Sequence, residues 1–345
     1  MTTHTPLPKT GCRPPAASPW WIGPKAGPGL TLFCLLTSFL LCLLAAPPRT
    51  SAQEVHLQPM TLHAGFTISN FRNVSANDAT AAFRVFAQTA GRKRGYQMDV
   101  DARIFDNMEA CEAEIKKGTI NLAILGAWDY TGMDIQQAME PIFVPLEQGS
   151  IYWENLLLTR RGGGLTNLAD LRSKDVMVLE RNAGELSRAW LDSILLAQHL
   201  GTKETFFRSL EPVVKPTAAI LPVFFGTKPA CLANRTSLQI MSELNPQVGS
   251  NLVIMAFSEP YLETVICISK SGWASEHARQ DLIQSIAEMN LEPGGRQILE
   301  LFKLDRLLPF KDEYLNTVRK LRAASNRLGK QTLAAQLGGQ TRSEP

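Results

Sequence analysis

The sequence has little of what a metalloenzyme or a cofactor-dependent enzyme needs. Among its 345 residues are six cysteines and five histidines, and they form neither a CxxC pair nor a His-rich cluster. Zinc sites draw on closely spaced Cys and His ligands, so we expect no metal site. The chain also lacks a Gly-x-Ser-x-Gly elbow, a P-loop and a dinucleotide-binding fingerprint. We therefore expect no cofactor and no catalytic residues.

Acidic residues are absent from the first 52 positions, which makes the overall charge of +3 misleading. Four of the 35 basic residues lie in that stretch, so the remaining chain has 31 basic against 32 acidic residues. A nearly neutral chain gives no support for nucleic-acid binding, which requires a basic surface. We therefore expect no nucleic-acid partner. The four basic residues are Lys9, Arg13, Lys25 and Arg49.

The same stretch has the layout of a secretory signal peptide. A basic, Pro-rich segment comes first, an uncharged apolar run follows at 30–46, and small residues follow at 50–52. Thr50 and Ala52 fit the small positions before a cleavage site, which predicts a signal peptide over 1–52 and export to the periplasm. An uncleaved membrane anchor is the alternative, because the apolar run is near the lower limit for a bilayer span. A lipid anchor on Cys42 is disfavoured by the bulky leucines before it.

Three cysteines remain after the predicted leader, and this odd number allows at most one disulfide. Cys111 falls on the apolar face of a predicted helix and is expected in the core. Pairing between Cys231 and Cys267 stays open at this point.

Strand and helix patterns alternate in the first part of the mature chain. A polar loop at 69–75 follows the first strand, and Ser75 with Asp78 fits a helix cap. Strand–helix alternation predicts a parallel sheet, whose ligands sit beyond the carboxyl ends of its strands. The relevant loops are then 69–75 and 126–130. The predicted elements are strands 62–68, 96–104 and 120–125, a helix from Ser75, and a helix at 107–117.

The pattern repeats after an apolar strand at 151–159 and a Gly-rich loop at 160–164. Extended passages at about 150–159 and 257–268 then join two lobes, in the layout of a hinge. The remainder of the chain is expected to be helical. Predicted elements are helices near 168–171, up to His199, at 217–225, 278–289, 295–302 and 311–327, and strands at 176–180, 206–213, 252–257 and 264–269.

Three segments carry a resemblance to a known family. They are 117–130, 164–179 and 243–260, the first of which reads KGTINLAILGAWDY. In their order and spacing, the chain resembles the substrate-binding proteins of phosphate, phosphite and phosphonate ABC importers. The resemblance implies an α/β fold of the type II periplasmic-binding-protein kind: two lobes, each a mostly parallel sheet flanked by helices, with two hinge crossings. It places lobe 1 at 53–155 and 261–345, and lobe 2 at 156–260.

The sequence departs from this family at three places. The family usually has Asp where Asn121 stands, a Ser/Thr-rich turn where this chain has 180–185, and a Gly-x-x-Asp-Ala run where it has 226–230. Hydroxyls and amides at a helix N-terminus hold the anion in the family. Glu185 would repel a phosphonate if it faced inward, whereas Asn182 and Ser187 supply hydrogen-bonding groups.

Candidate ligand-binding residues come from the loops at strand ends. Each has an alternative structural role: the two aromatic residues can pack in the core, the loop and helix-start residues can form turns or caps, the arginine can be solvated, and the last two can lie beside the hinge. The candidates are Ser69, Asn70, Trp128, Tyr130, Arg181, Asn182, Ser187, Ser258 and Glu259.

The function expected from these features is that of a periplasmic receptor. It closes two lobes around a small anionic solute, a phosphorus oxyanion, and presents it to an inner-membrane ABC permease. The alternative is a sensory or accessory module of the same fold that a membrane signalling partner reads. An enzyme on this scaffold would need a catalytic group, and the sequence offers only Glu185, Glu259 or Cys231 without evident activators.

Overall fold

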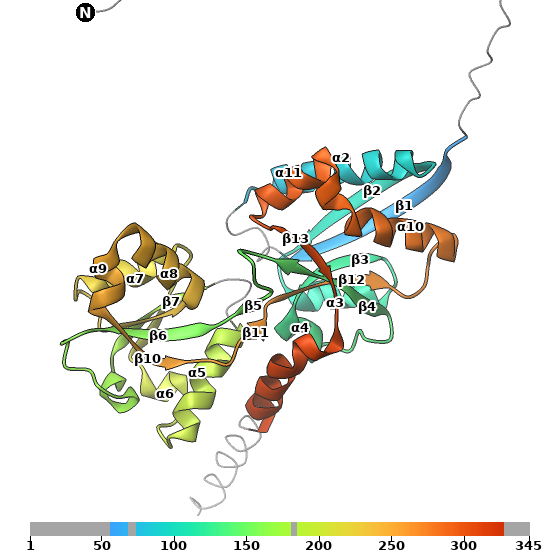
Figure 1. The fold of residues 1–345 in the computed structure, drawn as a ribbon. Helices are drawn as coiled ribbons and strands as arrows, with labels where there is room; N and C mark the ends of the chain where they lie inside the picture. The colour runs from blue at the N-terminus through green and yellow to red at the C-terminus, as the bar shows by residue number, and fades with distance from the viewer. Residues whose placement is uncertain (1–55, 68–73, 181–184, 328–345) are drawn as a thin grey trace, which may run out of the picture. The chain divides into compact units, whose positions relative to one another are not determined.

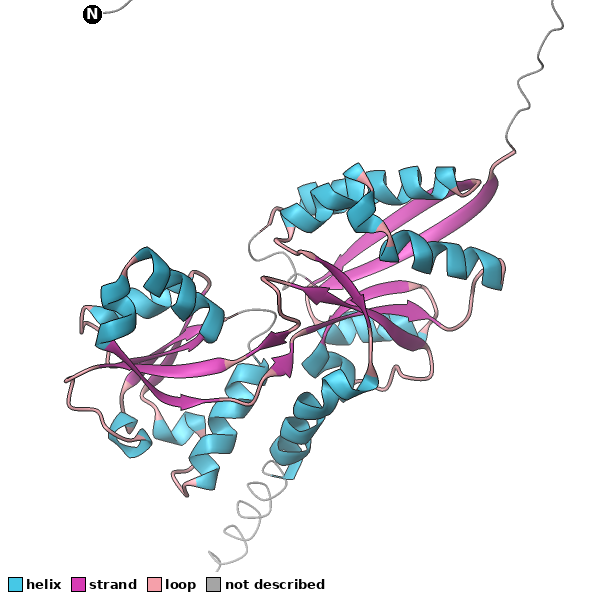
Figure 2. Cartoon of the chain, viewed as in Figure 1, coloured by secondary structure: helices cyan, strands magenta, loops and turns pink. Residues whose placement is uncertain are grey.

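The computed structural model describes residues 56–67, 74–180 and 185–327 (Figure 1). The predicted signal peptide, 1–52, lies outside the described residues. In the described part, the strands form a six-stranded sheet, a five-stranded sheet and a two-stranded sheet. Helices pack on both large sheets (Figure 2). This architecture is the predicted two-lobed α/β fold.

Lobe 1 is built on the six-stranded sheet, in the order β13-β4-β12-β3-β1-β2. Strands β1, β2 and β3 are parallel, as the strand–helix alternation predicts. Strand β12 returns to this sheet antiparallel to β3, and β4 and β13 add further antiparallel pairs. The elements are β1 (Gln58–Thr67), α2 (Ala76–Lys93), β2 (Tyr96–Phe105), α3 (Met108–Lys116), β3 (Leu122–Gly126), α4 (Ala127–Gly132), β4 (Met139–Leu146), β12 (Thr264–Ser269), α10 (Glu276–Ala287), η3 (Met289–Leu291), α11 (Pro293–Leu301), β13 (Arg306–Pro309) and η4 (Asp312–Leu315).

The apolar run of β3 is buried on both faces, which is why it lacks a polar alternation. Leu122 packs in the cluster under α2 and α10, whereas Ala123 and Leu125 pack in the opposite cluster with α3 and α4. Successive side chains of a strand point to opposite faces, so one short segment contributes to two cores.

Helix ends in lobe 1 follow local chemistry. Ser75 is the N-cap of α2, where its Oγ accepts a hydrogen bond from the Asp78 amide at 3.3 Å. Gly118 follows α3 with a φ of +75°, a left-handed conformation that glycine adopts without strain. Both boundaries match the sequence prediction to within a residue or two.

Lobe 2 is built on the five-stranded sheet, in the order β10-β6-β9-β7-β8. Strands β9, β7 and β8 are parallel, and β6 and β10 are antiparallel to their neighbours. The elements are β6 (Asn155–Arg160), η2 (Leu168–Leu171), β7 (Asp175–Leu179), α5 (Glu185–Ala197), α6 (Lys203–Phe206), β8 (Ser209–Val213), α7 (Pro216–Phe224), β9 (Ala230–Asn234), α8 (Arg235–Leu244), α9 (Pro246–Asn251) and β10 (Leu252–Phe257).

The two predicted crossings pair with each other. Strand β5 (Tyr152–Trp153) and strand β11 (Tyr261–Leu262) form the two-stranded antiparallel sheet. The predicted single strand at 151–159 is in fact two strands, because Glu154 separates β5 from β6. The chain therefore leaves one sheet, pairs briefly at the crossing, and then joins the next.

Each large sheet is mixed, and the expected mostly parallel pairing holds only for three strands of each. The returning strands cause this difference, because a chain that re-enters a sheet beside a parallel set runs in the opposite direction. Strand β4 was not predicted, because Pro141 and Pro145 disfavour a central strand. The sheet accommodates them with a register shift, in which Ile266 pairs with Phe143 but Cys267 pairs with Pro141.

The three described cysteines are free and buried. Cys231 lies on β9 of lobe 2 and Cys267 on β12 of lobe 1, so the pairing left open by the sequence does not occur. Burial raises the pKa of the Cys111 thiol to about 12 and raises the pKa of the other two thiols as well.

We expect the thiols of the chain without its leader to be unreactive in the native state. A thiol-specific chromogenic reagent at pH 8 should label none of Cys111, Cys231 and Cys267 within minutes and all three in denaturant, because the thiolate is both disfavoured and inaccessible. Rapid labelling of one thiol in the native protein would contradict the packing described here.

Candidate functional site

The carboxyl ends of parallel strands are where this kind of sheet binds ligands. In lobe 1, β1 ends at Thr67 and β3 at Gly126; in lobe 2, β7 ends at Leu179. The predicted site residues Ser69, Asn70, Arg181 and Asn182 belong to the segments after β1 and β7 and lie outside the described residues.

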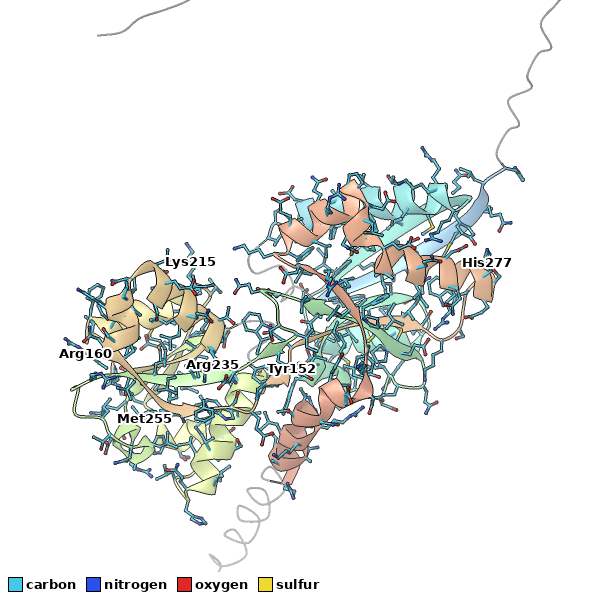
Figure 3. All side chains as sticks on the ribbon, in the orientation of Figure 1. Tyr152, Arg160, Lys215, Arg235, Met255 and His277 are labelled. Carbon is cyan, nitrogen blue, oxygen red and sulfur yellow. The ribbon has the colours of Figure 1, made fainter. Side chains whose placement is uncertain are left out.

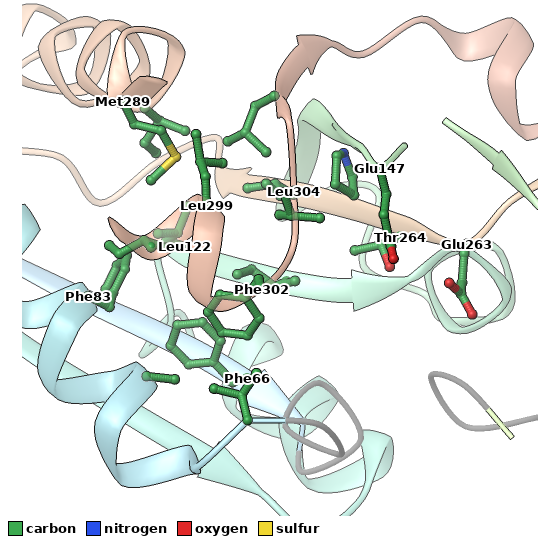
Figure 4. Close-up of a pocket in the computed structure, with 18 of the residues that line it drawn as sticks. Phe66, Phe83, Leu122, Glu147, Glu263, Thr264, Met289, Leu299, Phe302 and Leu304 are labelled. Atoms are coloured by element: carbon green, nitrogen blue, oxygen red, sulfur yellow. The ribbon is translucent and has the colours of Figure 1, made fainter. Parts of the chain in front are cut away.

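A cavity of about 180 Å³ lies at this edge of lobe 1 (Figure 4). Its walls are Phe66 of β1 and Ile124 of β3 from the sheet, Phe83 of α2 and Leu299 of α11 from the helices, and Phe302 after α11. The cavity is partly open to solvent, so a solute can reach its apolar walls.

Polar groups line only one end of the cavity. Apart from Trp153, the polar lining residues are Glu147, Glu180, Glu263 and Thr264. Figure 4 shows Glu147, Glu263 and Thr264 gathered away from Phe83, Leu122 and Met289. Among the described lining residues there is no Lys, Arg or His. Glu180, directly after β7, forms an ion pair with Arg188.

Trp128 belongs to helix α4, where the sequence predicted a loop. One face of its ring is covered by the Arg322 guanidinium, whose central carbon lies 3.9 Å from the ring centroid. The same guanidinium donates to the Trp128 carbonyl and to Thr131 Oγ1. Trp128 therefore anchors the helical segment 316–327 through this cation–π contact. A stacking role toward a solute remains a prediction.

Tyr130 packs in the core of lobe 1. Its side chain is 7% exposed and packs in the cluster that contains Cys111 and Val318. Burial raises the pKa of its hydroxyl to about 12. Tyr130 thus packs in the core, which is the structural alternative expected from the sequence. Its role in ligand binding stays a prediction.

Asp129 lies between Trp128 and Tyr130 in the sequence, and its carboxyl is in an unusual electrostatic environment. Burial raises the pKa of its carboxyl from 3.8 to about 6, although the nearby Arg322 opposes this shift. The carboxyl also lies against Gly126, where a Cβ would come within 2.7 Å of Asp129 Oδ2. A larger residue at the turn from β3 into α4 would therefore displace the Asp129 carboxylate. Asp129 was not among the predicted site residues, because its environment depends on Arg322, which comes from the other end of the chain.

A buried hydrogen-bond network at the crossing brings two predicted site residues together. The Asn155 side chain is its centre: Oδ1 accepts from Ser187 Oγ at 3.0 Å and from the Tyr261 hydroxyl at 2.9 Å. Ser258 Oγ accepts from the Asn155 amide at 2.9 Å, and the Ser258 amide donates to the Asn155 carbonyl. We call Asn155, Ser187, Ser258 and Tyr261 the crossing network. Ser187 and Ser258 thus have a structural role that the sequence could not reveal.

The other predicted hinge residue, Glu259, is exposed and forms an ion pair with Lys320. This contact fits the alternative in which the carboxylate lies beside the hinge. Nearby, Glu154 forms a two-contact ion pair with Arg235, which Figure 3 labels at the start of α8. The pair links the residue between β5 and β6 to lobe 2, beside the crossing network.

The described residues include neither a helix long and apolar enough to cross a membrane nor a group of three His, Cys, Asp or Glu side chains able to hold a metal ion.

A family model described as "ABC transporter, phosphonate, periplasmic substrate-binding protein" matches residues 68–315 of the sequence. The match spans both lobes and both crossings. The chain belongs to this family of phosphonate-binding periplasmic proteins.

Solved structures agree with the fold of this phosphonate-family protein. A Xanthomonas citri protein bound to ATP aligns with a TM-score of 0.58 and 12% identity, covering 78% of this chain and 98% of its own. A binding-protein component of an ABC phosphonate transporter from Pseudomonas aeruginosa gives 0.54 and 14%, covering 78% and 87%. PhnD1 from Prochlorococcus marinus in complex with methylphosphonate gives 0.53 and 14%, covering 77% and 98%. A search of curated proteins found no significant match.

Membership confirms the predicted class of function. The family consists of substrate-binding proteins of ABC transporters, not of enzymes, and it is a periplasmic family. The identity of the solute depends on the site of this particular chain.

The crossing network predicts a specific loss of stability in the phosphonate-family protein. Replacing Asn155 with Ala removes a hydrogen-bond acceptor from the buried Tyr261 hydroxyl and from the half-buried Ser187 hydroxyl, so we expect the free energy of unfolding to fall by about 2–3 kcal/mol. Asn251→Ala, at an exposed position, should change it by less than about 0.5 kcal/mol. Equal denaturation midpoints for the two variants would contradict the role of the network.

Asp129 predicts a pH dependence of stability. Its pKa is higher in the folded protein than in the unfolded chain, so ionisation favours unfolding. Between pH 4 and pH 6, Asp129 should lower the free energy of unfolding by an amount on the order of 2 kcal/mol. Asp129→Asn should remove this contribution and raise the melting temperature relative to wild type at pH 7. Asp134→Asn, at an exposed position, should keep the wild-type pH profile; identical profiles for all three proteins would refute the assignment.

Proposed function

We propose that this protein is the solute receptor of an ABC importer and that its solute is an organophosphonate. The family supplies the phosphonate class and the transport role. The lining of the cavity favours an organic compound over inorganic phosphate or phosphite, because most of the described lining is hydrocarbon. A small inorganic oxyanion gains nothing from such walls, since it is held by hydrogen-bond donors and positive charge.

The phosphonate group is proposed to bind at the start of α5, outside the apolar part of the cavity. Arg181 and Asn182 immediately follow Glu180 in the sequence and precede this helix of 13 residues. An arginine can hold a phosphonate through two parallel hydrogen bonds, and a helix N-terminus favours an anion. Ser69 and Asn70, which follow β1 in the sequence, are the proposed contacts from lobe 1, and Trp128 is a proposed wall.

The proposed partner is the inner-membrane permease of the importer, to which the receptor delivers its solute after export to the periplasm. Family membership supports this partner over the sensory module that the sequence also allowed. In a reconstituted system, the loaded receptor should stimulate the ATPase activity of its permease. A response confined to a signalling kinase would support the sensory alternative.

A thermal-shift panel tests the solute class. Methylphosphonate and phenylphosphonate should raise the melting temperature, whereas inorganic phosphate, sulfate, amino acids and carboxylates should not. A ligand at about a hundred times its dissociation constant adds about 2.7 kcal/mol to stability, which a melting curve resolves. Stabilisation by carboxylates or amino acids alone would refute the organophosphonate.

Arg181 provides a test of the phosphonate position. Arg181→Ala should weaken methylphosphonate binding by a factor on the order of 100 without lowering the melting temperature of the free protein. Arg161→Ala is the matched control, because Arg161 is an exposed arginine of another loop, with Nε bonded to the Ser250 carbonyl. Equal affinities in the two variants would place the phosphonate elsewhere.

A further inference from the structure

The cavity in lobe 1 separates an apolar body from a polar end, and this separation restricts what it can hold. Apolar residues of α2, α11 and the sheet enclose the body, and the polar residues lie together at strand ends. The Phe66 and Phe83 rings meet edge to face, with centroids 5.5 Å apart, so two aromatic residues from different elements define one wall. This contact fixes the shape of the wall.

Water is a poor occupant of the apolar body. A buried water needs two to four polar partners, and the walls around Phe66, Phe83, Leu122 and Leu299 supply hydrocarbon instead. An engineered apolar cavity of about 150 Å³ in another protein stays dry and binds benzene. The volume here, about 180 Å³, therefore suits a hydrocarbon group of the size of a phenyl ring or a short alkyl chain.

The apolar walls exclude the opposite orientation of a phosphonate. A doubly charged phosphonate placed among Phe66, Phe83 and Leu299 would lose its hydration and gain no hydrogen bond from these side chains. An uncharged substituent avoids this penalty. The cavity thus receives the organic end of a solute rather than its anionic end.

We propose that the solute of this protein carries a phenyl-sized hydrocarbon group, and that this group binds in the apolar body of the lobe 1 cavity. The inference rests on the proposed organophosphonate function and adds the class of substituent. Methylphosphonate leaves the body unfilled, whereas phenylphosphonate fills most of it. Burying the larger group removes more apolar surface from water and so strengthens binding.

Calorimetric titration of the protein, produced from its full-length sequence, tests this proposal. Phenylphosphonate should bind at least tenfold more tightly than methylphosphonate. Ala79 lies on α2, is 2% exposed and lines the cavity, so Ala79→Leu should abolish the preference while methylphosphonate binding is kept. Ala81→Leu makes the same change at an exposed position of the same helix and should keep the preference.

A second variant and a neutral probe separate the possible failures. Leu304→Phe enlarges a lining residue outside α2 and serves if Ala79→Leu does not fold. Toluene, which has no phosphonate, should raise the melting temperature of wild type and of Ala81→Leu but not of the filled variants. Toluene stabilisation without binding of either phosphonate would support the hydrocarbon site and overturn the proposed function. Equal affinity for the two phosphonates in wild type, or failure of toluene to stabilise it, would overturn the hydrocarbon site.

Discussion

The hydrogen-bond network around Asn155 is the constraint on which the two-lobed arrangement of this chain depends. The chain passes between its two large sheets twice, and each passage is only a few residues long. Asn155, the first residue of β6, accepts a hydrogen bond at its carbonyl from the Ser258 amide of the second passage and donates from its own amide to the Ser258 hydroxyl. Its side chain accepts from Tyr261 and Ser187. Buried polar groups are costly unless they are paired, so these contacts hold the passages together in one arrangement. The same passages lead into Trp153 and Glu263 of the cavity lining.

The cavity differs from a simple anion-binding pocket, because its described lining consists of apolar walls and a cluster of carboxylates. Family membership places this protein among phosphonate-binding proteins, yet the described lining holds hydrocarbon and glutamate. These observations agree if the anionic and organic ends of the solute bind in different places. Specificity then comes from the substituent, because each extra hydrocarbon group buried in a matching cavity adds binding free energy, whereas the phosphonate is common to the whole class.

Local patterns were sufficient to predict the first half of lobe 1. The order of elements from β1 to β3 was predicted correctly. Its signals, such as the helix cap Ser75 and the apolar run of β3, lie within a few residues of the elements that they specify. Strand β4 escaped prediction because its prolines are accommodated only by pairing with β12, which lies more than a hundred residues later. The crossing network could not be predicted for the same reason, since Asn155 meets Ser258 and Tyr261 across separations of 103 and 106 residues. Trp128 was placed at the correct strand end, but its cover by Arg322 comes from the far end of the chain.

The heat-capacity change of binding measures most directly whether binding buries a hydrocarbon group in lobe 1. Titrating the protein with phenylphosphonate at several temperatures gives that quantity from the slope of the binding enthalpy. Burial of apolar surface makes the heat-capacity change negative. Phenylphosphonate should give a clearly more negative value than methylphosphonate, at one ligand per chain. Equal values for the two compounds would show that the phenyl group stays in water and does not enter the cavity.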